Sequence, residues 1–296
     1  HVSEDGGKTW REDRFKAVHP DNHDLAIDPR SPKRLLLGTD GGTYQSYNGG
    51  ATWGHLNNTA IGEFYRVGMD MSTPFRICGG LQDNTNWVGP SATLSKNGIQ
   101  NGDWQPLNGG DGSYCAFDAR DPNAIYAESQ QGYIFRINLK TGEEKTLRPE
   151  PTEGSAAYRF HWNSPLVASR HSPGVLYHGA NRVFKLENGG DAMKAISPDL
   201  STKDYDKMTA VGSGAEDYGV VYALAESPTI AGVLWAGTDD GKLWKTTNDG
   251  ATWTDLTASI PAAAKGLWIS RIELSAHDAQ VAYLAVDGHR SARYAP

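Results

Sequence analysis

The sequence TTNDGATW at residues 246–253 is nearly the same as SYNGGATW at 46–53 and SEDGGKTW at 3–10. All three fit the pattern Ser/Thr-x-Asp/Asn-x-Gly-x-Thr-Trp, and the first two copies begin 43 residues apart, at positions 3 and 46. Weaker copies lie between the second and third: SKNGIQNGDW at 95–104, INLKTG at 137–142 and LENGGDAM at 186–193. A period of about 40 to 60 residues is typical of a repeat architecture.

Each strong copy is predicted to form the corner of a β-hairpin. An Asp or Asn side chain in a turn accepts hydrogen bonds from backbone N–H groups one or two residues further on, and Gly supplies the left-handed backbone. The Trp that ends the phrase is expected to cover the turn and to pack against the next repeat. The phrase therefore predicts a scaffold element and not a binding site.

A longer block with one recurring order of elements precedes the corners. The four clearest blocks are AIDPRSPKRLLLGTDGGTYQS at 26–46, AFDARDPNAIYAESQQGYIFRI at 116–137, VASRHSPGVLYHGANRVFKL at 167–186 and LAESPTIAGVLWAGTDDGKLWKT at 224–246. Each consists of an apolar strand, a Pro-containing turn, a second apolar strand, a polar turn and an aromatic-rich strand. With the strand after the Trp, this makes four antiparallel strands per repeat, which is typical of a β-propeller blade.

The predicted fold is all-β, a β-propeller of four-stranded antiparallel blades. Five blades are expected to be complete, at about 24–57, 63–107, 112–149, 157–198 and 218–257. Residues 1–15 would supply the end of one further blade and residues 266–293 the first two strands of another. These two pieces either combine into a sixth blade or belong to a larger ring. Because the chain begins at His1, inside a motif, we expect 1–296 to be a single propeller region of a longer multi-domain chain.

The composition argues against several classes of protein. The formal charge is −7 and the Lys and Arg residues are scattered, whereas a nucleic-acid surface needs a clustered basic stripe. No apolar run approaches the roughly 18 residues of a membrane span. Cys78 and Cys115 each lie in an apolar, strand-like run, so they are interpreted as two buried thiols, with a disulfide between neighbouring strands as the alternative. The sequence indicates no cofactor and no metal.

Further segments, together with the corner phrase, resemble the Asp-box, or BNR-repeat, proteins. These segments are GGLQDN at 79–84, GGDG at 109–112, YRFHWNSP at 158–165, YHGANRVFK at 177–185, ISPDL at 196–200 and WAGTDDG at 235–241. They are similar to segments of the large bacterial sortilin-like proteins, which are often labelled glycosyl hydrolase BNR-repeat proteins. The resemblance implies a β-propeller that is secreted, periplasmic or on the cell surface. The three-arginine cluster that sialidases use is not evident, which argues against sialidase activity.

The order of the strands assigns the loops to two sides of the predicted propeller. In an up-and-down blade, the first-to-second and third-to-fourth turns lie on one side, and the second-to-third turns and the links between blades lie on the other. The Pro turns and the corner phrases therefore share a side. Ring closure is expected to bring the opposite loops together at one acidic, aromatic and His-bearing mouth. Such a mouth suits a neutral polar ligand such as a sugar, because aromatic faces stack on sugar rings while carboxylates and amides bind the hydroxyls.

The candidate site residues come from these opposite loops. The predicted ligand-binding residues are His19, Asp21, His23, Asp40, Gln82, Asn84, Arg159, His161, Trp162, Asn181, Arg182, Asp239, Asp240 and Trp268. Asp83 and Asp111 are the candidate acid and base of a glycosidase, whose chemistry needs two carboxylates roughly 5 to 9.5 Å apart. The simpler interpretation is that each Asp, in its Gly-flanked turn, binds backbone amides.

Other members of this set also have two interpretations. His19, Asp21 and His23 alternate, so they project from one side of an extended segment, either as metal ligands that need a fourth group or as a hydrogen-bonded polar cluster. The pair His161 and Trp162 either braces the inner ring or touches the ligand. Arg159 and Arg182 are candidates to bind a carboxylate.

Two functions of different classes are consistent with these features. We favour a binding or scaffold module for a carbohydrate, a peptide or partner protein subunits, because no complete catalytic constellation is present and a fold alone does not imply a reaction. The alternative is a glycoside hydrolase, or half of a two-propeller hydrolase cleft, that acts on a polysaccharide with Asp general acid/base chemistry.

Overall fold

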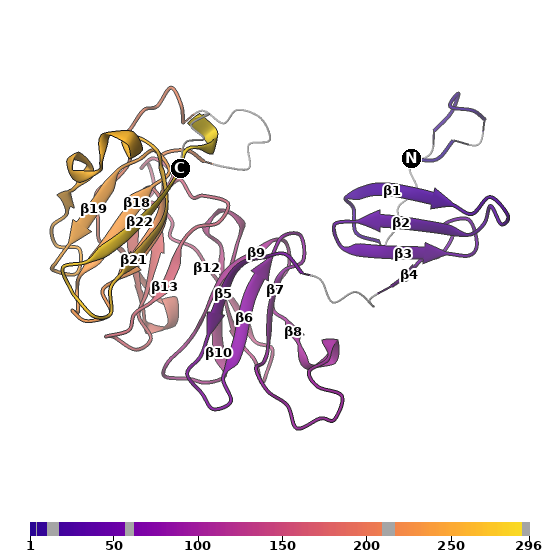
Figure 1. Ribbon diagram of the computed structural model, residues 1–296, viewed down its shortest axis with the longest axis horizontal. Coiled ribbons are helices and arrows are strands. Elements are labelled where there is room, and N and C mark those ends of the chain that lie inside the picture. The colour runs from indigo at the N-terminus through magenta and orange to yellow at the C-terminus, as the bar shows by residue number, and fades with distance from the viewer. Residues whose placement is uncertain (4, 11–17, 57–61, 209–216, 292–296) are drawn as a thin grey trace. The chain divides into compact units, whose positions relative to one another are not determined.

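The secondary structure of the chain is almost entirely β (Figure 1). The computed structural model describes residues 1–3, 5–10, 18–56, 62–208 and 217–291. Six antiparallel sheets follow one another along the chain, and in each the strands pair in sequence order. The chain divides into two compact units, His1–Glu63 and Phe64–Pro296, called unit 1 and unit 2 below.

Unit 1 contains one four-stranded sheet. Its strands are β1 (Asn22–Ile27), β2 (Leu35–Thr39), β3 (Gly42–Ser46) and β4 (Gly54–His55). The corner phrase at 46–53 connects β3 to β4, as predicted. The phrase at 3–10 belongs to the same unit, whereas residues 4 and 11–15 of the predicted N-terminal partial blade lie outside the described residues.

Unit 2 contains four four-stranded sheets and one two-stranded sheet. The strands are β5 (Phe64–Met69), β6 (Arg76–Leu81), β7 (Asn86–Pro90) and β8 (Gln105–Pro106); β9 (Gly112–Phe117), β10 (Ala124–Ser129), β11 (Ile134–Asn138) and β12 (Glu144–Leu147); β13 (Leu166–Ala168), β14 (Leu176–Gly179), β15 (Val183–Glu187) and β16 (Ala192–Ala195); β17 (Val221–Glu226), β18 (Leu234–Thr238), β19 (Leu243–Thr246) and β20 (Thr254–Asp255); and β21 (Trp268–Leu274) with β22 (Ala282–Asp287). The predicted fold class, an all-β chain of β-propeller blades, is confirmed. The five complete blades and the C-terminal pair of strands are also where the sequence predicts them.

Within the part of the chain that the structure describes, the helical content is limited to short 3₁₀ segments. They are η1 (Asn101–Asp103), η2 (Gln130–Gly132), η3 (Asn188–Gly190), η4 (Thr257–Ser259), η5 (Ala262–Ala264) and η6 (His289–Ser291). Among the described residues, no helix is long and apolar enough to cross a membrane.

Neighbouring blades of unit 2 enclose separate apolar cores. The first strands of the blades pack in series, β5 with β9, β9 with β13, β13 with β17 and β17 with β21. Tyr126 and Leu186 belong to the core shared by the β9–β12 and β13–β16 blades, and Leu234 belongs to the next core along the chain. All three side chains are fully buried. Since burial of an apolar side chain contributes about 1.5 to 3 kcal/mol, these cores hold the blades together.

A close approach of the backbones of two blades requires glycine at position 80. A Cβ atom added at Gly80 of β6 would lie 2.1 Å from the backbone nitrogen of Ser113 and 2.2 Å from the carbonyl carbon of Gly112. The backbones of β6 and β9 are therefore nearly in contact, and any side chain at position 80 would separate them.

The corner phrases form the same hydrogen bonds in all three strong copies. In the copy at 246–253, Thr246 Oγ1 accepts from the Gly250 N–H at 3.1 Å and Asn248 Oδ1 accepts from the Thr252 N–H at 2.9 Å. Equivalent bonds of 2.7 to 2.9 Å occur in the copies at 46–53 and 3–10. The Asn or Asp therefore reaches four residues ahead, and not one or two as expected. The indole of Trp253 donates to the Ile196 carbonyl at 2.7 Å, so it packs against the preceding blade and not the next one.

The predicted separation of the loops into two sides is found within individual blades. In the β17–β20 blade, the Asp249 N–H of the corner donates to the Gly232 carbonyl of the Pro turn at 2.9 Å. At the opposite end, the Asp239 N–H of the second-to-third turn donates to the Val220 carbonyl just before β17 at 3.1 Å. The C-terminal ends of the innermost strands thus lie on the side of the corners, and their N-terminal ends lie on the side of the predicted mouth.

The two cysteines form a disulfide. The Cys78–Cys115 bond joins β6 to β9 in the neighbouring blade and closes a sequence separation of 37 residues. The interpretation as two buried thiols is therefore wrong, and the alternative of a bond between neighbouring strands is right. Both sulfurs lie in the apolar core between the two blades.

Candidate functional site

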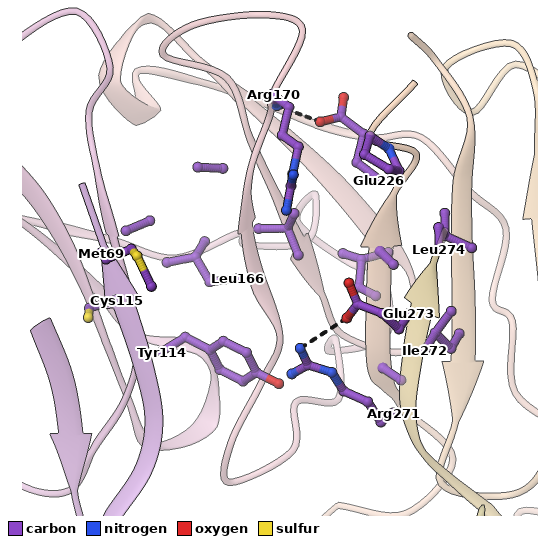
Figure 2. Close-up of a pocket in the computed structure, with 18 of the residues that line it drawn as sticks. Met69, Tyr114, Cys115, Leu166, Arg170, Glu226, Arg271, Ile272, Glu273 and Leu274 are labelled. Carbon is purple, nitrogen blue, oxygen red and sulfur yellow. Dashed lines mark hydrogen bonds and ion pairs between the residues drawn. The ribbon is translucent and has the colours of Figure 1, made fainter. Parts of the chain in front are cut away.

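A cavity of about 360 Å³ lies among the innermost strands of unit 2 (Figure 2). Its walls are the end of β5, the whole of β13 and the C-terminal halves of β9, β17 and β21, together with Arg170, Pro228 and Ala276 from the turns that follow. We call this the central cavity. It lies towards the side of the Pro turns and corners, whereas the sequence placed the ligand site on the opposite side.

The lining of the central cavity combines apolar and charged groups. Met69, Leu166, Ile272 and Leu274 contribute apolar surface. The polar groups are Tyr114 and four charged side chains, namely Arg170, Glu226, Arg271 and Glu273. Mixed linings of this kind are typical of small-molecule sites, in which a few polar groups fix the orientation of the ligand.

A half-buried arginine, Arg66, lies behind Tyr114. The Arg66 guanidinium donates from Nε to the Tyr114 hydroxyl at 3.0 Å and from a terminal nitrogen to the Tyr222 hydroxyl at 3.2 Å. These contacts connect β5, β9 and β17, which belong to three different blades. Although burial disfavours its charged form, the two tyrosine hydroxyls raise the pKa of Arg66, so the guanidinium remains charged. Burial raises the pKa of Tyr114, against the effect of Arg66, so its hydroxyl keeps its proton.

His161 and Trp268 complete this inner cluster. The His161 ring contacts Tyr222 edge-on at a centroid distance of 4.7 Å, and Trp268 contacts Tyr222 edge-on at 4.6 Å. Arg290 lies over the Trp268 ring, 4.3 Å from its centroid. His161 is 2% exposed, and burial, followed by the charges of Arg290 and Arg66, lowers the pKa of His161 to about 3. His161 is therefore a neutral, buried histidine whose ring packs against Tyr222 and Trp268.

The two candidate catalytic aspartates lie next to each other at the opposite end of the blades. Asp83 is in the β6–β7 turn with φ 57°, and its N–H donates to Asp111 Oδ1 at 3.0 Å. Asp111 Oδ2 accepts from the Trp162 indole at 2.7 Å. Gln82 and Asn84 flank Asp83, and the Asn84 side chain donates to the Gln82 carbonyl at 2.9 Å. Both oxygens of Asp111 therefore accept hydrogen bonds from other loops, one from a backbone amide and one from an indole.

Replacing Trp162 by Phe should reveal this structural role. The change leaves Asp111 Oδ2 buried without its donor, so we expect the free energy of unfolding to fall by about 2 kcal/mol. Trp235→Phe is the matched control, because the Trp235 indole donates to none of the described residues, and it should cost less than half as much. Urea unfolding measures both values, and equal losses would contradict the assignment.

Arg159 and Asn181 are also held by partners within the protein. Both side chains donate to Asp199 Oδ2, at 3.1 Å and 2.9 Å respectively. Arg159 additionally donates to the Gly219 carbonyl at 3.1 Å, and Arg182 donates to the Ser197 carbonyl at 3.1 Å. These contacts tie the β14–β15 turn to the segments on either side of it.

Asp239 and Asp240 lie in the β18–β19 turn. Asp239 Oδ1 accepts from the Gly219 and Val220 N–H groups at 3.0 and 2.9 Å, whereas its buried Oδ2 has no hydrogen-bond partner among the described residues. Burial, followed by the charge of Asp240, raises the pKa of Asp239 to about 7, although hydrogen bonds from the backbone oppose the shift. Asp240 Oδ2 accepts from both the backbone and the side chain of Thr202 at 2.7 Å.

The remaining four candidates lie in unit 1. His19 Nδ1 lies 3.7 Å from Asp21 Oδ2, and the His23 ring contacts the Asp40 carboxylate. His19 and His23 thus pair with different aspartates.

Sequence reasoning missed Arg66, Tyr222 and the arginines of the central cavity. A usable signal was a Tyr near the start of several innermost strands, at Tyr65, Tyr114 and Tyr222. Tyr65 and Tyr222 occupy bulges, since Phe64 and Arg66 pair with consecutive residues of β6, and Val221 and Ala223 pair with consecutive residues of β18. A bulge changes the direction in which side chains point. Strict alternation of side chains between the two faces of a strand therefore assigns these tyrosines to the wrong face.

The comparisons with known proteins agree with this architecture. No protein-family model and no curated protein matches the chain. Among solved structures, the chain is similar to an ancestral GH74 enzyme, with a TM-score of 0.51 and 16% identity over 88% of this chain and 33% of that one. It is also similar to the GH74 enzyme of Niastella koreensis, with a TM-score of 0.50 and 14% identity over 90% of this chain and 44% of that one. The shared fold is a β-propeller.

A third similar structure is the extracellular domain of a hybrid two-component system from B. thetaiotaomicron, with a TM-score of 0.47 and 15% identity over 91% of this chain and 33% of that one. The chain spans less than half the length of each of these three structures.

Proposed function

We propose that the chain is a binding module whose ligand occupies the central cavity of unit 2. The observation that supports this proposal is the lining of the cavity, to which the innermost strands of all four blades of unit 2 and strand β21 of its two-stranded sheet contribute. A volume of about 360 Å³ lies within the range of small-molecule sites. Carbohydrates and peptides are the ligand classes that the sequence favours for such a propeller.

The same proposal includes the setting of the module. We propose that it is of the Asp-box, sortilin-like kind and works outside the cytoplasm. The repeated corner hydrogen bonds support the first part. The Cys78–Cys115 bond supports the second, because structural disulfides persist mainly in oxidising compartments.

Hydrolysis of a glycoside is the competing function, and Asp111 argues against it. A general acid or base must reach the substrate with a carboxylate oxygen. Both oxygens of Asp111 instead accept hydrogen bonds from Asp83 and Trp162, at the end of the blades away from the central cavity. Asp111 is also only 7% exposed.

Blocking the central cavity tests the proposal. Ala276 is an exposed residue that lines the cavity, so Ala276→Trp should fill its rim without disturbing a core. Against a panel of oligosaccharides and short peptides, we expect the wild-type chain to bind at least one class and the variant to bind it at least tenfold more weakly. Ala262→Trp places the same side chain at an exposed position away from the cavity and should leave the affinity unchanged.

Two results would contradict the binding proposal. Binding that survives Ala276→Trp would place the ligand elsewhere. Release of sugar products by the wild-type chain, abolished by Asp83→Ala or Asp111→Ala, would establish the hydrolase instead.

A further inference from the structure

The geometry points to an acidic sugar as the ligand of the central cavity, with its carboxylate bound by Arg170 and Arg271. This inference rests on the proposed function and specifies its ligand class. It also differs from the neutral ligand that the predicted acidic mouth suggested.

The first supporting feature is the guanidinium of Arg170. The Arg170 backbone N–H donates to Glu226 at 2.6 Å, which fixes the base of the side chain at the rim. From there the side chain extends into the cavity (Figure 2). No acidic side chain among the described residues pairs with its guanidinium, which is therefore free to bind an anion. Guanidinium groups bind carboxylates through two parallel hydrogen bonds, a geometry that water does not reproduce.

The second feature is that the two carboxylates of the cavity are already occupied. Glu226 accepts from the Ser169 hydroxyl at 2.8 Å with one oxygen and from the Arg170 N–H with the other. Glu273 pairs with Arg271 at 3.3 Å. Because both partners of that pair are 62% exposed, water and salt screen it and the pair is weak. A ligand carboxylate can therefore replace Glu273 on Arg271 at little cost.

The third feature is a hydroxyl group directed into the cavity. The Tyr114 oxygen accepts from Arg66 at 3.0 Å, so the hydroxyl proton remains to be donated to a ligand. Tyr114 and Arg271 extend towards each other from β9 and β21 (Figure 2). The positive charge of Arg66 behind the tyrosine strengthens Tyr114 as a hydrogen-bond donor and adds to the positive potential of the cavity.

The apolar wall indicates a sugar acid and not a bare inorganic anion. Met69, whose side chain is exposed, and the partly exposed Leu274 line the cavity together with these polar groups. One face of a sugar ring carries C–H groups that pack on such side chains, while its hydroxyls bind groups such as Tyr114. A small inorganic anion would leave the apolar wall uncovered.

The test compares acidic and neutral sugars on the full chain. Calorimetric titrations would use galacturonate and glucuronate, each against its neutral counterpart, galactose or glucose, and digalacturonate against the monomer. We expect each uronate to bind at least tenfold more tightly than its neutral counterpart. Tighter binding of digalacturonate than of galacturonate would identify an oligomer end as the source of the carboxylate, and equal binding would identify the free sugar acid.

Three variants assign the effect to the cavity. Arg170→Gln should weaken uronate binding about tenfold or more, as expected for loss of a charge-assisted hydrogen bond. Arg30→Gln, at an arginine whose side chain is 91% exposed in unit 1, is the matched control and should have no effect. Glu273→Gln should strengthen binding several-fold, because it removes the competitor for Arg271. A purely structural role of the Arg271–Glu273 pair would not predict that gain.

The outcomes separate this inference from the proposed function. If neutral sugars or peptides bind and Ala276→Trp blocks them, while uronates bind no better and Arg170→Gln has no effect, the inference is wrong and the binding module stands. If nothing on the panel binds, or Ala276→Trp blocks nothing, both are wrong. A gain with Glu273→Gln together with a loss for Arg170→Gln supports both.

Discussion

Removing the Cys78–Cys115 disulfide should lower the free energy of unfolding by about 4 kcal/mol. The bond closes a sequence separation of 37 residues, and a cross-link of that length restricts the unfolded chain by about this amount. It also joins β6 to β9, whose backbones approach so closely at Gly80 that only glycine fits. Urea unfolding of the wild-type chain, with and without a thiol reductant, measures the effect directly.

The variant Cys78→Ala/Cys115→Ala provides an independent measurement. Cys78 is fully buried and Cys115 is 9% exposed, so the double variant loses packing as well as the cross-link. It should therefore be less stable than the reduced wild-type chain. A reduced wild-type chain that unfolds at the same urea concentration as the oxidised one would show that the bond adds no stability.

Most of the fold can be predicted from sequence because its signals are local. The corner at 246–253 closes through hydrogen bonds between residues four apart, and the same residue types recur in the copy at 46–53. The turn at Pro228 and the strands around it lie within one repeat as well. Such patterns involve residues that are close in the sequence. The positions of the repeated patterns therefore give the number of blades and the bounds of each blade.

The disulfide depends on contacts that no local pattern reports. Cys78 lies in the second strand of one blade and Cys115 in the first strand of the next. Whether two such residues face each other depends on how the blades pack, and therefore on details such as the glycine at position 80. The sequence alone favoured free thiols for this reason.

The candidate site was predicted less well, for a physical reason that concerns carboxylates. The aspartates of the second-to-third turns and of the links between blades suggested an acidic mouth. Asp111 and Asp240, however, accept hydrogen bonds from neighbouring groups of the protein. Buried carboxylates require such donors, and loops rich in Asp and Gly supply them. Apart from Arg170, the arginines and tyrosines that line or back the central cavity come from strands. Two of them, Arg66 and Tyr222, are 156 positions apart in the sequence. Only the packing of the blades brings these residues together.

Asp239 should make the stability of the chain depend on pH near neutrality. Its pKa is raised to about 7 from an ordinary value of 3.8, chiefly by burial. Between these two pH values the unfolded chain has lost the Asp239 proton that the folded chain still holds. The contribution of Asp239 to the free energy of unfolding is therefore fully present below pH 4 and is lost as the pH rises through 7. One pKa unit corresponds to about 1.4 kcal/mol, so the whole loss amounts to roughly 4 kcal/mol, of which about 3 kcal/mol falls between pH 5 and pH 8.

Asp239→Asn should remove this dependence. The amide oxygen can still accept from the Gly219 and Val220 N–H groups, and the side chain carries no charge at any pH. Urea unfolding at pH 5 and at pH 8 gives the free energy of unfolding of both proteins. The difference, variant minus wild type, should be about 3 kcal/mol larger at pH 8 than at pH 5.

Asp70→Asn is the control, because the pKa of Asp70 is shifted in the opposite direction from that of Asp239. Burial alone would raise the pKa of Asp70, but hydrogen bonds from Arg76 and Ser72 outweigh it and lower that pKa to about 2. Asp70 is then ionised in both the folded and the unfolded chain throughout the range from pH 5 to pH 8. Its replacement should thus cost the same stability at both ends of the range. Because the buried histidines His161 and His178 are present in every variant, their titration cancels from each comparison. A difference between Asp239→Asn and the wild-type chain that stays constant with pH would mean that Asp239 is ionised in its buried position and that another group compensates its charge.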